Sequence, residues 1–373
     1  MTSQGSTKSK STSRRKFLLA AGASGAATIA MPQVSRAQTI SWKYQSTWPT
    51  KDIFHEFAVD YAKKVNDMTG GRLKLEVLAA GAVVPAFQLQ DAVHSGILDG
   101  GHGVTVYWYG KNKAASLFGT PPSFGWDAHS MLAWFYYGGG EALYNELIND
   151  ILKLNLVGLL YFPMPTQPLG WFKKEVKTPD DLKNIKYRTV GLSADLFKEL
   201  GSAVTILPGG EIVPALDRGL IDAAEFNNPS SDLLLGFPDV SKYFMVGSHH
   251  QQMESFEISF NKAKYNSLPA ELKSILRYAA FAATADQFAM AHDRYSKDLE
   301  EIKKRGVNVI RTPESILQAQ LAAWDKVMAA NTDPFFQKVL ASQKAWAKRT
   351  VPYFLTNNLH AADLEKAYKH FFS

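Results

Sequence analysis

The stretch that decides the fold is 185–228, which reads IKYRTVGLSADLFKELGSAVTILPGGEIVPALDRGLIDAAEFNN. Short runs rich in β-branched and aromatic residues alternate here with segments whose apolar spacing suits a helix. We expect strands at IKYRTV, AVTILP and IDAAEF, and helices at SADLFKELG and GEIVPALDRGLI. Alternating strands and helices of these lengths predict a mainly parallel α/β architecture.

The same alternation continues outward in both directions. Further strands are predicted at 39–47, 73–80, 101–106, 156–162 and 255–261, with helices at 52–68, 85–98, 127–155 and 263–304. The glycines of YYGGG predict a break within the helix at 127–155. A helix is also expected to begin at TPDDL, residues 178–182.

No linker rich in Gly, Ser or Pro occurs after residue 38. If there are two domains, the chain must therefore cross between them through ordered segments. We therefore predict a two-lobed α/β protein with crossovers between the lobes, a long hinge-spanning helix and a central cleft, where ligands of open α/β sheets bind. The expected domains are an export signal at 1–37, lobe I at 38–162 with part of 252–300, lobe II at 163–251 with part of 300–330, and a C-terminal helical extension at 331–373.

The excess of basic charge belongs to the first 37 residues. These hold six Lys and Arg and no acid, so 41 basic residues less six leaves 35, equal to the 35 acidic residues. The remainder is neutral, which removes the compositional support for nucleic-acid binding. The chain has no cysteine, which excludes disulfides and thiol chemistry.

The first 37 residues read as an export signal. A basic start with Arg14-Arg15 precedes a mildly apolar run, and Ser35-Arg36-Ala37 offers small residues for cleavage. This arrangement is typical of a twin-arginine signal, with a Sec signal or an uncleaved anchor as the alternatives. We expect a soluble periplasmic protein that starts near Gln38.

Known catalytic motifs are missing from the sequence: it has no Walker loop, no HExxH and no GxGxxG after a strand. His249-His250 does not favour a metal site, because neighbours on a strand point to opposite faces.

Arg188 lies in a buried-looking strand with no acid within four positions. A guanidinium keeps its proton, so its burial requires an anion, for which a planar carboxylate is the best match. Two partners stay open, an internal Asp or Glu and the carboxylate of a ligand. The strand end favours the ligand.

Three more polar residues lie at comparable places, namely Gln167, Glu225 and Gln251. Each follows or ends an apolar run, and each alone is more simply read as solvated. Together they would supply the oxygen ligands that hard cations use.

Several motifs resemble the substrate-binding proteins of tripartite ATP-independent periplasmic (TRAP) transporters, over roughly residues 40–300. They are LPGGEIVPALDRGLIDAAEF, STWP, AFQLQDAVHSGILDGG, YWYGKN, WFYYGGGEALYNE, QPLGWFKKEVKTPDDLKNIKYRTVG and HQQMESFEISFNKAKYNSLP. The sequence is most similar to the branch that binds 2-oxo and 2-hydroxy monocarboxylates together with a metal ion.

The resemblance implies a non-enzymatic receptor that passes a small organic acid to a TRAP membrane permease. It implies that Arg188 pairs with the substrate carboxylate, and that Gln167, Glu225, the Phe226 carbonyl and Gln251 hold sodium or calcium. Gln167 would also contact the substrate. No organic cofactor is expected.

Two departures bear on the ligand. Gln251 is a neutral amide where some metal-using relatives have an acid, and Glu254 could replace it, although strand alternation would turn Glu254 to the opposite face. Asn227 follows Phe226 where many relatives have a small apolar residue, so Asn227 is expected to reach the ligand.

The expected pocket walls are Trp48, Phe87, Tyr107, Tyr109 and Phe226, with plain core packing as the alternative for each. The C-terminal extension either packs on its own lobe or is exchanged across a homodimer. Two other functions stay open: a ligand sensor for a membrane kinase, and an exported lyase or isomerase with Glu225 as base, for which no second acid or base is evident.

Overall fold

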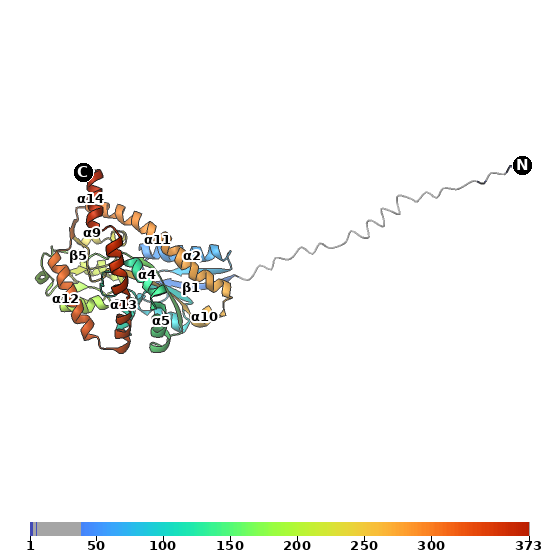
Figure 1. Ribbon diagram of the computed structural model, residues 1–373, viewed down its shortest axis with the longest axis horizontal. Coiled ribbons are helices and arrows are strands. Elements are labelled where there is room, and N and C mark those ends of the chain that lie inside the picture. Colours follow the sequence, from blue (N-terminus) through green and yellow to red (C-terminus); the bar gives the residue numbers. More distant parts are fainter. Residues whose placement is uncertain (3–4, 6–38, 373) are drawn as a thin grey trace. The chain divides into compact units, whose positions relative to one another are not determined.

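Two β-sheets organise the chain in the computed structural model, which describes residues 1, 2, 5 and 39–372 (Figure 1). Apart from Met1, Thr2 and Gly5, the predicted export signal lies outside the described residues. The first sheet has the order β2-β1-β3-β10-β4, with β1 Ile40–Ser46, β2 Leu73–Leu78, β3 Gly100–Val104, β4 Leu156–Met164 and β10 Glu254–Asn261. The second has the order β11-β9-β5-β8-β6-β7, with β5 Gly170–Phe172, β6 Lys186–Arg188, β7 Ala203–Thr205, β8 Ala223–Ala224, β9 Tyr243–Val246 and β11 Asn308–Arg311.

Each sheet is the centre of one lobe, and we call the lobes of the first and second sheets lobe I and lobe II. The chain passes from lobe I to lobe II between β4 and β5, returns between β9 and β10, and reaches lobe II again at β11. Residues from Thr39 onward nevertheless form one compact unit. The predicted two-lobed α/β fold with crossovers is confirmed.

Parallel ladders are the majority, as predicted, but both sheets are mixed, with five parallel and four antiparallel ladders. β10 runs antiparallel to β3 and β4, and β5 runs antiparallel to β8 and β9. Both strands enter their sheet directly from the other lobe. The other ladders are parallel.

The helices agree with the predicted pattern, with local exceptions. Their bounds are α2 Ile53–Met68, α3 Leu89–Ser95, α4 Ala128–Tyr137, α5 Gly140–Glu146, α6 Leu192–Glu199, α7 Gly209–Asp217, α8 Pro229–Leu235, α9 Phe237–Val240, α10 Lys262–Ser267, α11 Ala270–Lys304, α12 Glu314–Ala330, α13 Pro334–Asn357 and α14 Ala361–Phe372. Short 3₁₀ helices cover 86–88, 105–108, 113–118 and 179–182, and a π-helical turn covers 147–151.

Local chemistry explains where several helices begin and end. Asp52 caps α2 by accepting a hydrogen bond from the Phe54 N–H, as an N-terminal cap should. The predicted break near YYGGG is confirmed, because α4 ends before Gly138 and Gly139 adopts a left-handed φ of 88°. The TPDDL segment forms only one 3₁₀ turn, since the chain enters β6 soon afterwards.

Helix α11 spans both lobes. It packs against α2 and β4 of lobe I and α8 of lobe II, and Figure 1 shows it passing beside α2. Its buried residues include Leu272 and Leu276. The helix therefore occupies the hinge-spanning position that we predicted.

The C-terminal extension has two different parts. The first half of α13 packs on the body, with Phe336 and Val339 buried, and Gln343 donates a hydrogen bond to the Leu117 carbonyl. Helix α14 has no buried residue and projects from the body in Figure 1. None of the helices within 39–372 combines the length and the apolar character needed to cross a membrane.

Candidate binding site between the two lobes

Arg188 ends β6 and is 1% exposed. β6 pairs in parallel with β8, with Arg188 beside Ala224, so the next residue of that strand, Glu225, is brought to the guanidinium. Arg188 Nη1 lies 2.9 Å from Glu225 Oε1, and Nε and Nη2 donate to the Leu207 carbonyl at 2.8 and 2.6 Å. The internal acid that sequence left open as a partner is therefore present, and it is Glu225.

This pairing does not use all the hydrogen-bonding capacity of Arg188. A guanidinium has five N–H donors, and Nη1 also donates to the Glu225 carbonyl at 3.2 Å, so four contacts are made to three acceptors. One N–H of Nη2 remains. Arg188 can hold Glu225 and still offer a donor to a ligand.

The four residues predicted to hold a cation lie together. Gln167 is on the crossover from β4 to β5 and Gln251 on the crossover from β9 to β10, and the Gln167 backbone N–H donates to the Gln251 carbonyl at 3.0 Å. The Gln167 side-chain amide donates to Glu225 Oε2 and to the Phe226 carbonyl. All four side chains are buried.

Two oxygens in this group lack a hydrogen-bond partner. Gln167 Oε1 and Gln251 Oε1 are both buried and unpartnered. Buried amide oxygens normally find a donor, and leaving one unpaired costs about 1–3 kcal/mol. With the Glu225 carboxylate and the Phe226 carbonyl, the donor set consists of oxygens only, which suits sodium or calcium. The residues present therefore fit such an ion.

Burial raises the pKa of Glu225, and the nearby Arg188 opposes that rise. Because the charged partner lies at 2.9 Å, we take Glu225 to be ionised in the pair. No group of three or more His, Asp or Glu in 39–372 is arranged to hold a metal, so the candidate cation site depends on amides and a carbonyl.

All predicted site residues except Phe87 and Tyr109 line a single small cavity between the lobes. Lobe I contributes Trp48 and Tyr107, and the Trp48 indole is held by His102 Nδ1 at 3.1 Å. Asn227 lines it from lobe II, and its Nδ2 is buried without a partner.

Phe87 and Tyr109 lie outside this lining. Phe87 packs edge-on against the Tyr107 ring at 4.8 Å between ring centroids. The Tyr109 hydroxyl donates to the Asp195 carboxylate at 2.9 Å. Phe87 therefore supports a wall of the cavity, and Tyr109 connects lobe I to lobe II.

Sequence reasoning missed Val190 and misplaced Glu254, which both line the cavity. Glu254 was expected to face away from Gln251 by strand alternation. β10 begins only at Glu254, so Gln251 is outside the strand and alternation does not relate the two. The signal that could have placed Glu254 is its position as the first residue of a strand that follows a crossover.

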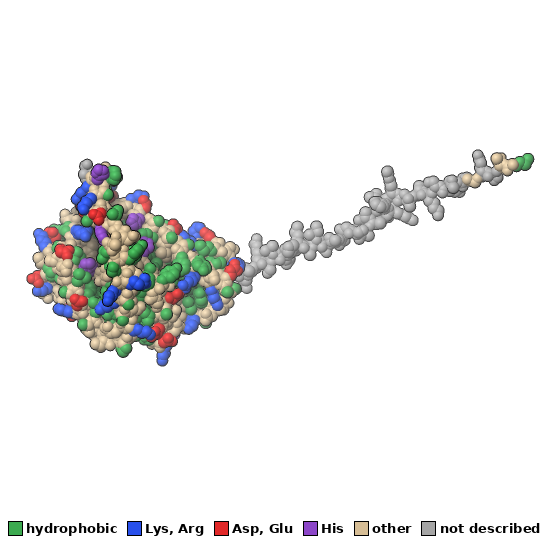
Figure 2. All heavy atoms as spheres, in the orientation of Figure 1, with side chains coloured by type: hydrophobic (Ala, Val, Ile, Leu, Met, Phe, Trp, Pro, Cys, Tyr) green, Lys and Arg blue, Asp and Glu red, His purple; other side chains and the backbone are tan. Residues whose placement is uncertain are grey.

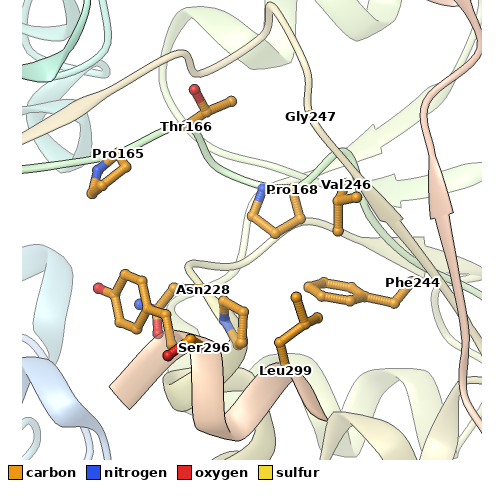
Figure 3. Close-up of a pocket in the computed structure, with 11 residues that line it drawn as sticks. Pro165, Thr166, Pro168, Asn228, Phe244, Val246, Gly247, Ser296 and Leu299 are labelled. Atoms are coloured by element: carbon orange, nitrogen blue, oxygen red, sulfur yellow. The ribbon is translucent and has the colours of Figure 1, made fainter. Parts of the chain in front are cut away.

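A second, more apolar pocket of about 280 Å³ lies between the crossover from β4 to β5 and helix α11. Figure 3 shows Pro165, Thr166 and Pro168 across this pocket from Ser296 and Leu299 of α11. It has no charged lining residue, so it does not compete as the site of an anionic ligand.

Basic and acidic side chains are interspersed on the face shown in Figure 2, without a broad basic surface there. A cleft between two α/β lobes, with an arginine and a cluster of buried oxygens, defines the class of solute-binding proteins that close over a small ligand.

Residues 44–338 match the family described as bacterial extracellular solute-binding protein, family 7 (DctP). The chain therefore belongs to this family of periplasmic receptors that serve TRAP transporters. It is 31% identical over 360 residues to the monocarboxylate 2-oxoacid-binding periplasmic protein of Nostoc sp., covering 93% of this chain and 97% of that relative.

Two solved TRAP solute-binding proteins are each 30% identical and cover 90% of this chain and 100% of their own. The protein from Colwellia psychrerythraea has bound calcium and pyruvate, with a TM-score of 0.80. That from Pseudoalteromonas atlantica has bound sodium and pyruvate, with a TM-score of 0.81.

Proposed function

We propose that this receptor captures a small 2-oxo or 2-hydroxy monocarboxylate together with a sodium or calcium ion and passes it to a TRAP permease. The observation that carries the proposal is the pair of buried, unpartnered oxygens of Gln167 and Gln251 beside the Arg188–Glu225 pair. Similarity to the Nostoc 2-oxoacid-binding protein and to two pyruvate-bound receptors supports this substrate class.

In this proposal the residues around the cavity have different tasks. Arg188 offers its remaining N–H to the ligand carboxylate while it keeps Glu225 in place. Gln167, Glu225, the Phe226 carbonyl and Gln251 hold the cation, which adds positive charge beside the carboxylate. Trp48 and Tyr107 close the cavity from lobe I, and Asn227 offers a donor from lobe II.

The charges of the cavity slightly favour sodium. With Glu254 protonated, Arg188, Glu225 and a monocarboxylate sum to −1, which sodium neutralises and calcium turns into +1. A buried net charge is costly. The oxygen donors of the site suit calcium equally well, so the proposal keeps both ions.

A conservative substitution at Arg188 tests the carboxylate contact. Arg188→Ala would leave Glu225 buried and unpaired, so a loss of binding would have a structural cause. Arg188→Lys keeps the positive charge and loses the planar fork. We expect it to weaken pyruvate binding by about tenfold or more in calorimetry while the ligand-free protein still folds. Unchanged affinity would remove Arg188 from the ligand contacts.

We infer that the chain is a receptor without catalytic activity. Both oxygens of Glu225 are engaged, one by Arg188 and the other by Gln167, which leaves it poorly placed as a base for a lyase or isomerase. Conversion of bound pyruvate or lactate on long incubation, followed by proton NMR, would contradict this. A sensor for a membrane kinase would use the same cavity, and a pull-down with membrane components separates it from a permease-linked receptor.

We also propose that 1–37 is a twin-arginine export signal cleaved near Ala37. A separate proposal concerns the lobe boundaries: lobe I comprises 38–162 with part of 252–300, and lobe II comprises 163–251 with part of 300–330. Basic residues and small residues at the cleavage position support the first proposal. N-terminal sequencing of periplasmic protein, in cells with and without twin-arginine export, tests it.

We propose further that helix α14 joins two copies of the chain in a homodimer. Leu364, Tyr368, Phe371 and Phe372 are exposed at helical spacing on α14, an apolar face with no partner among the described residues of this chain. Removal of residues 358–373 should convert a dimer to a monomer in light scattering. A full-length monomer would contradict the proposal.

A further inference from the structure

Strand β10 carries two buried acids with opposite surroundings. Glu257 is 1% exposed, and its carboxylate accepts hydrogen bonds from Trp108 Nε1 at 2.7 Å and from the Tyr144 hydroxyl. Glu254 is 3% exposed, and its carboxyl group has no hydrogen-bond partner within 39–372. A buried carboxyl group without a partner destabilises the fold.

Glu254 faces the cavity between the lobes. It lines the cavity from lobe I, whereas Arg188 and Glu225 line it from lobe II. The register of β10 with β4 shifts between Ser255 and Phe256, one pair beyond Glu254, so this end of the strand departs from regular pairing. Glu254 therefore lines the space where a ligand would bind, from the lobe opposite to that of Arg188.

The chemistry of a small acid limits what Glu254 can contact. The ligand carboxylate belongs to Arg188 and the cation in the function proposed above, and the other polar atom of a 2-oxo or 2-hydroxy acid is the oxygen at C2. Burial and the nearby Glu225 raise the pKa of Glu254 to about 8, against the effect of Arg188. The side chain accordingly keeps its proton at neutral pH and is an O–H donor.

We propose that Glu254 is a specificity-determining residue that donates a hydrogen bond to the C2 oxygen of the bound acid. It thereby selects 2-oxo and 2-hydroxy acids over carboxylic acids that have no oxygen at C2. This inference rests on the function proposed above, and it explains why an otherwise destabilising carboxyl group is present at this position.

The test compares pyruvate with propionate, which has the same carbon chain without the C2 oxygen. Calorimetry measures both ligands, with sodium and with calcium, for the wild type, Glu254→Met and Glu254→Gln. Glu254→Met should weaken pyruvate binding by about tenfold. The apparent affinity for propionate, measured directly or by displacement of pyruvate, should stay unchanged. Glu254→Gln keeps an N–H donor, so it should retain most of the pyruvate affinity.

Glu257 is the matched control on the same strand. Glu257→Met removes a carboxylate that satisfies two buried donors, so it should lower the thermal midpoint and leave the ratio of pyruvate to propionate affinity as in the wild type. Glu254→Met should hold or raise the midpoint of the ligand-free protein, because it removes an unpaired buried acid.

Three results would overturn the inference. Equal losses for pyruvate and propionate would mean that Glu254 acts on the cation or on packing, and no loss for either would remove it from the site. Equal pyruvate affinities for the Met and Gln variants would exclude a donated hydrogen bond. If the wild type bound no pyruvate with any cation, the proposed function would be contradicted too. If only the inference about Glu254 is wrong, the wild type still binds pyruvate, so the two failures are distinguishable.

Discussion

Arg188 is buried at the end of β6, where Glu225, directly after the neighbouring strand β8, neutralises its charge. Its burial and its need for an anion followed from the surrounding strand pattern, and the structure places it at 1% exposure. Its internal partner did not follow, because Glu225 is 37 residues away and reaches Arg188 through the register of β6 with β8. Strand register is set by packing of the whole sheet, which a single sequence segment does not determine.

Gly209 controls the position of Phe226, whose carbonyl is a proposed cation ligand. A Cβ at Gly209 would lie 2.5 Å from Phe226 Cε2, so Gly209→Ala must displace that ring. We expect the variant to weaken cation-dependent pyruvate binding by roughly tenfold or more, since small displacements of ligating groups are costly. Calorimetry with sodium and calcium measures it.

The control for Gly209 is Gly110, where an added Cβ meets no atom within 4 Å. Gly110→Ala should bind as the wild type does. If Gly209→Ala also kept full affinity, the Phe226 carbonyl would not be a cation ligand in this position.

At the scale of elements, the hydrophobic pattern predicted most strands and helices near their observed bounds. It missed the antiparallel direction of β5 and β10, because strand direction depends on which lobe the chain enters and leaves no mark on the pattern. The predicted strand at 255–261 begins one residue late, so Glu254 was not expected at the edge of the cavity.

A contact between elements also links the lobes at the edge of the cleft. Asp195, in α6 of lobe II, accepts hydrogen bonds from the Tyr109 hydroxyl and from Lys113 Nζ at 2.7 Å, both in lobe I. Asp195→Asn should favour the open form and weaken pyruvate binding by roughly two- to fivefold without touching the ligand. Stopped-flow tryptophan fluorescence should show faster ligand release.

Asp180 offers a comparison within one lobe, since its pair with Lys183 is exposed and does not cross the cleft. Asp180→Asn should leave pyruvate release unchanged. Equal rates for wild type and Asp195→Asn would show that this contact does not hold the lobes together.

At the scale of the whole molecule, contacts between the lobes include buried acidic side chains. Asp52 of lobe I accepts a hydrogen bond from the Ser231 hydroxyl of lobe II at 2.7 Å, and burial raises the pKa of Asp52 from 3.8 to about 7. The folded state therefore holds a proton on Asp52 that the unfolded state releases above pH 3.8. That contribution to stability is present at low pH and is lost as the pH rises toward 7.

Asp52→Asn removes this titration and keeps an acceptor for the α2 cap. Relative to wild type, the variant should gain about 1.4 kcal/mol of unfolding free energy per pH unit between pH 4 and 7. The difference between the two proteins is the informative quantity, because burial lowers the pKa of His102 and His250 to about 3 and gives an opposite slope below pH 6.5. The unfolding free energies of both proteins are measured with urea at each pH. If their difference were the same at every pH, Asp52 would not have a raised pKa.

We propose that a cation and a carboxylate bind together between the lobes. The most direct test is calorimetric titration of pyruvate into chelator-treated protein in three buffers, which contain sodium, calcium, or neither with a bulky organic cation as counter-ion. We expect tight pyruvate binding with at least one of the two metal ions and little or none without a metal ion. Equal affinity in all three buffers would contradict it, because Arg188 alone would then suffice and the oxygens of Gln167 and Gln251 would have no cation to hold.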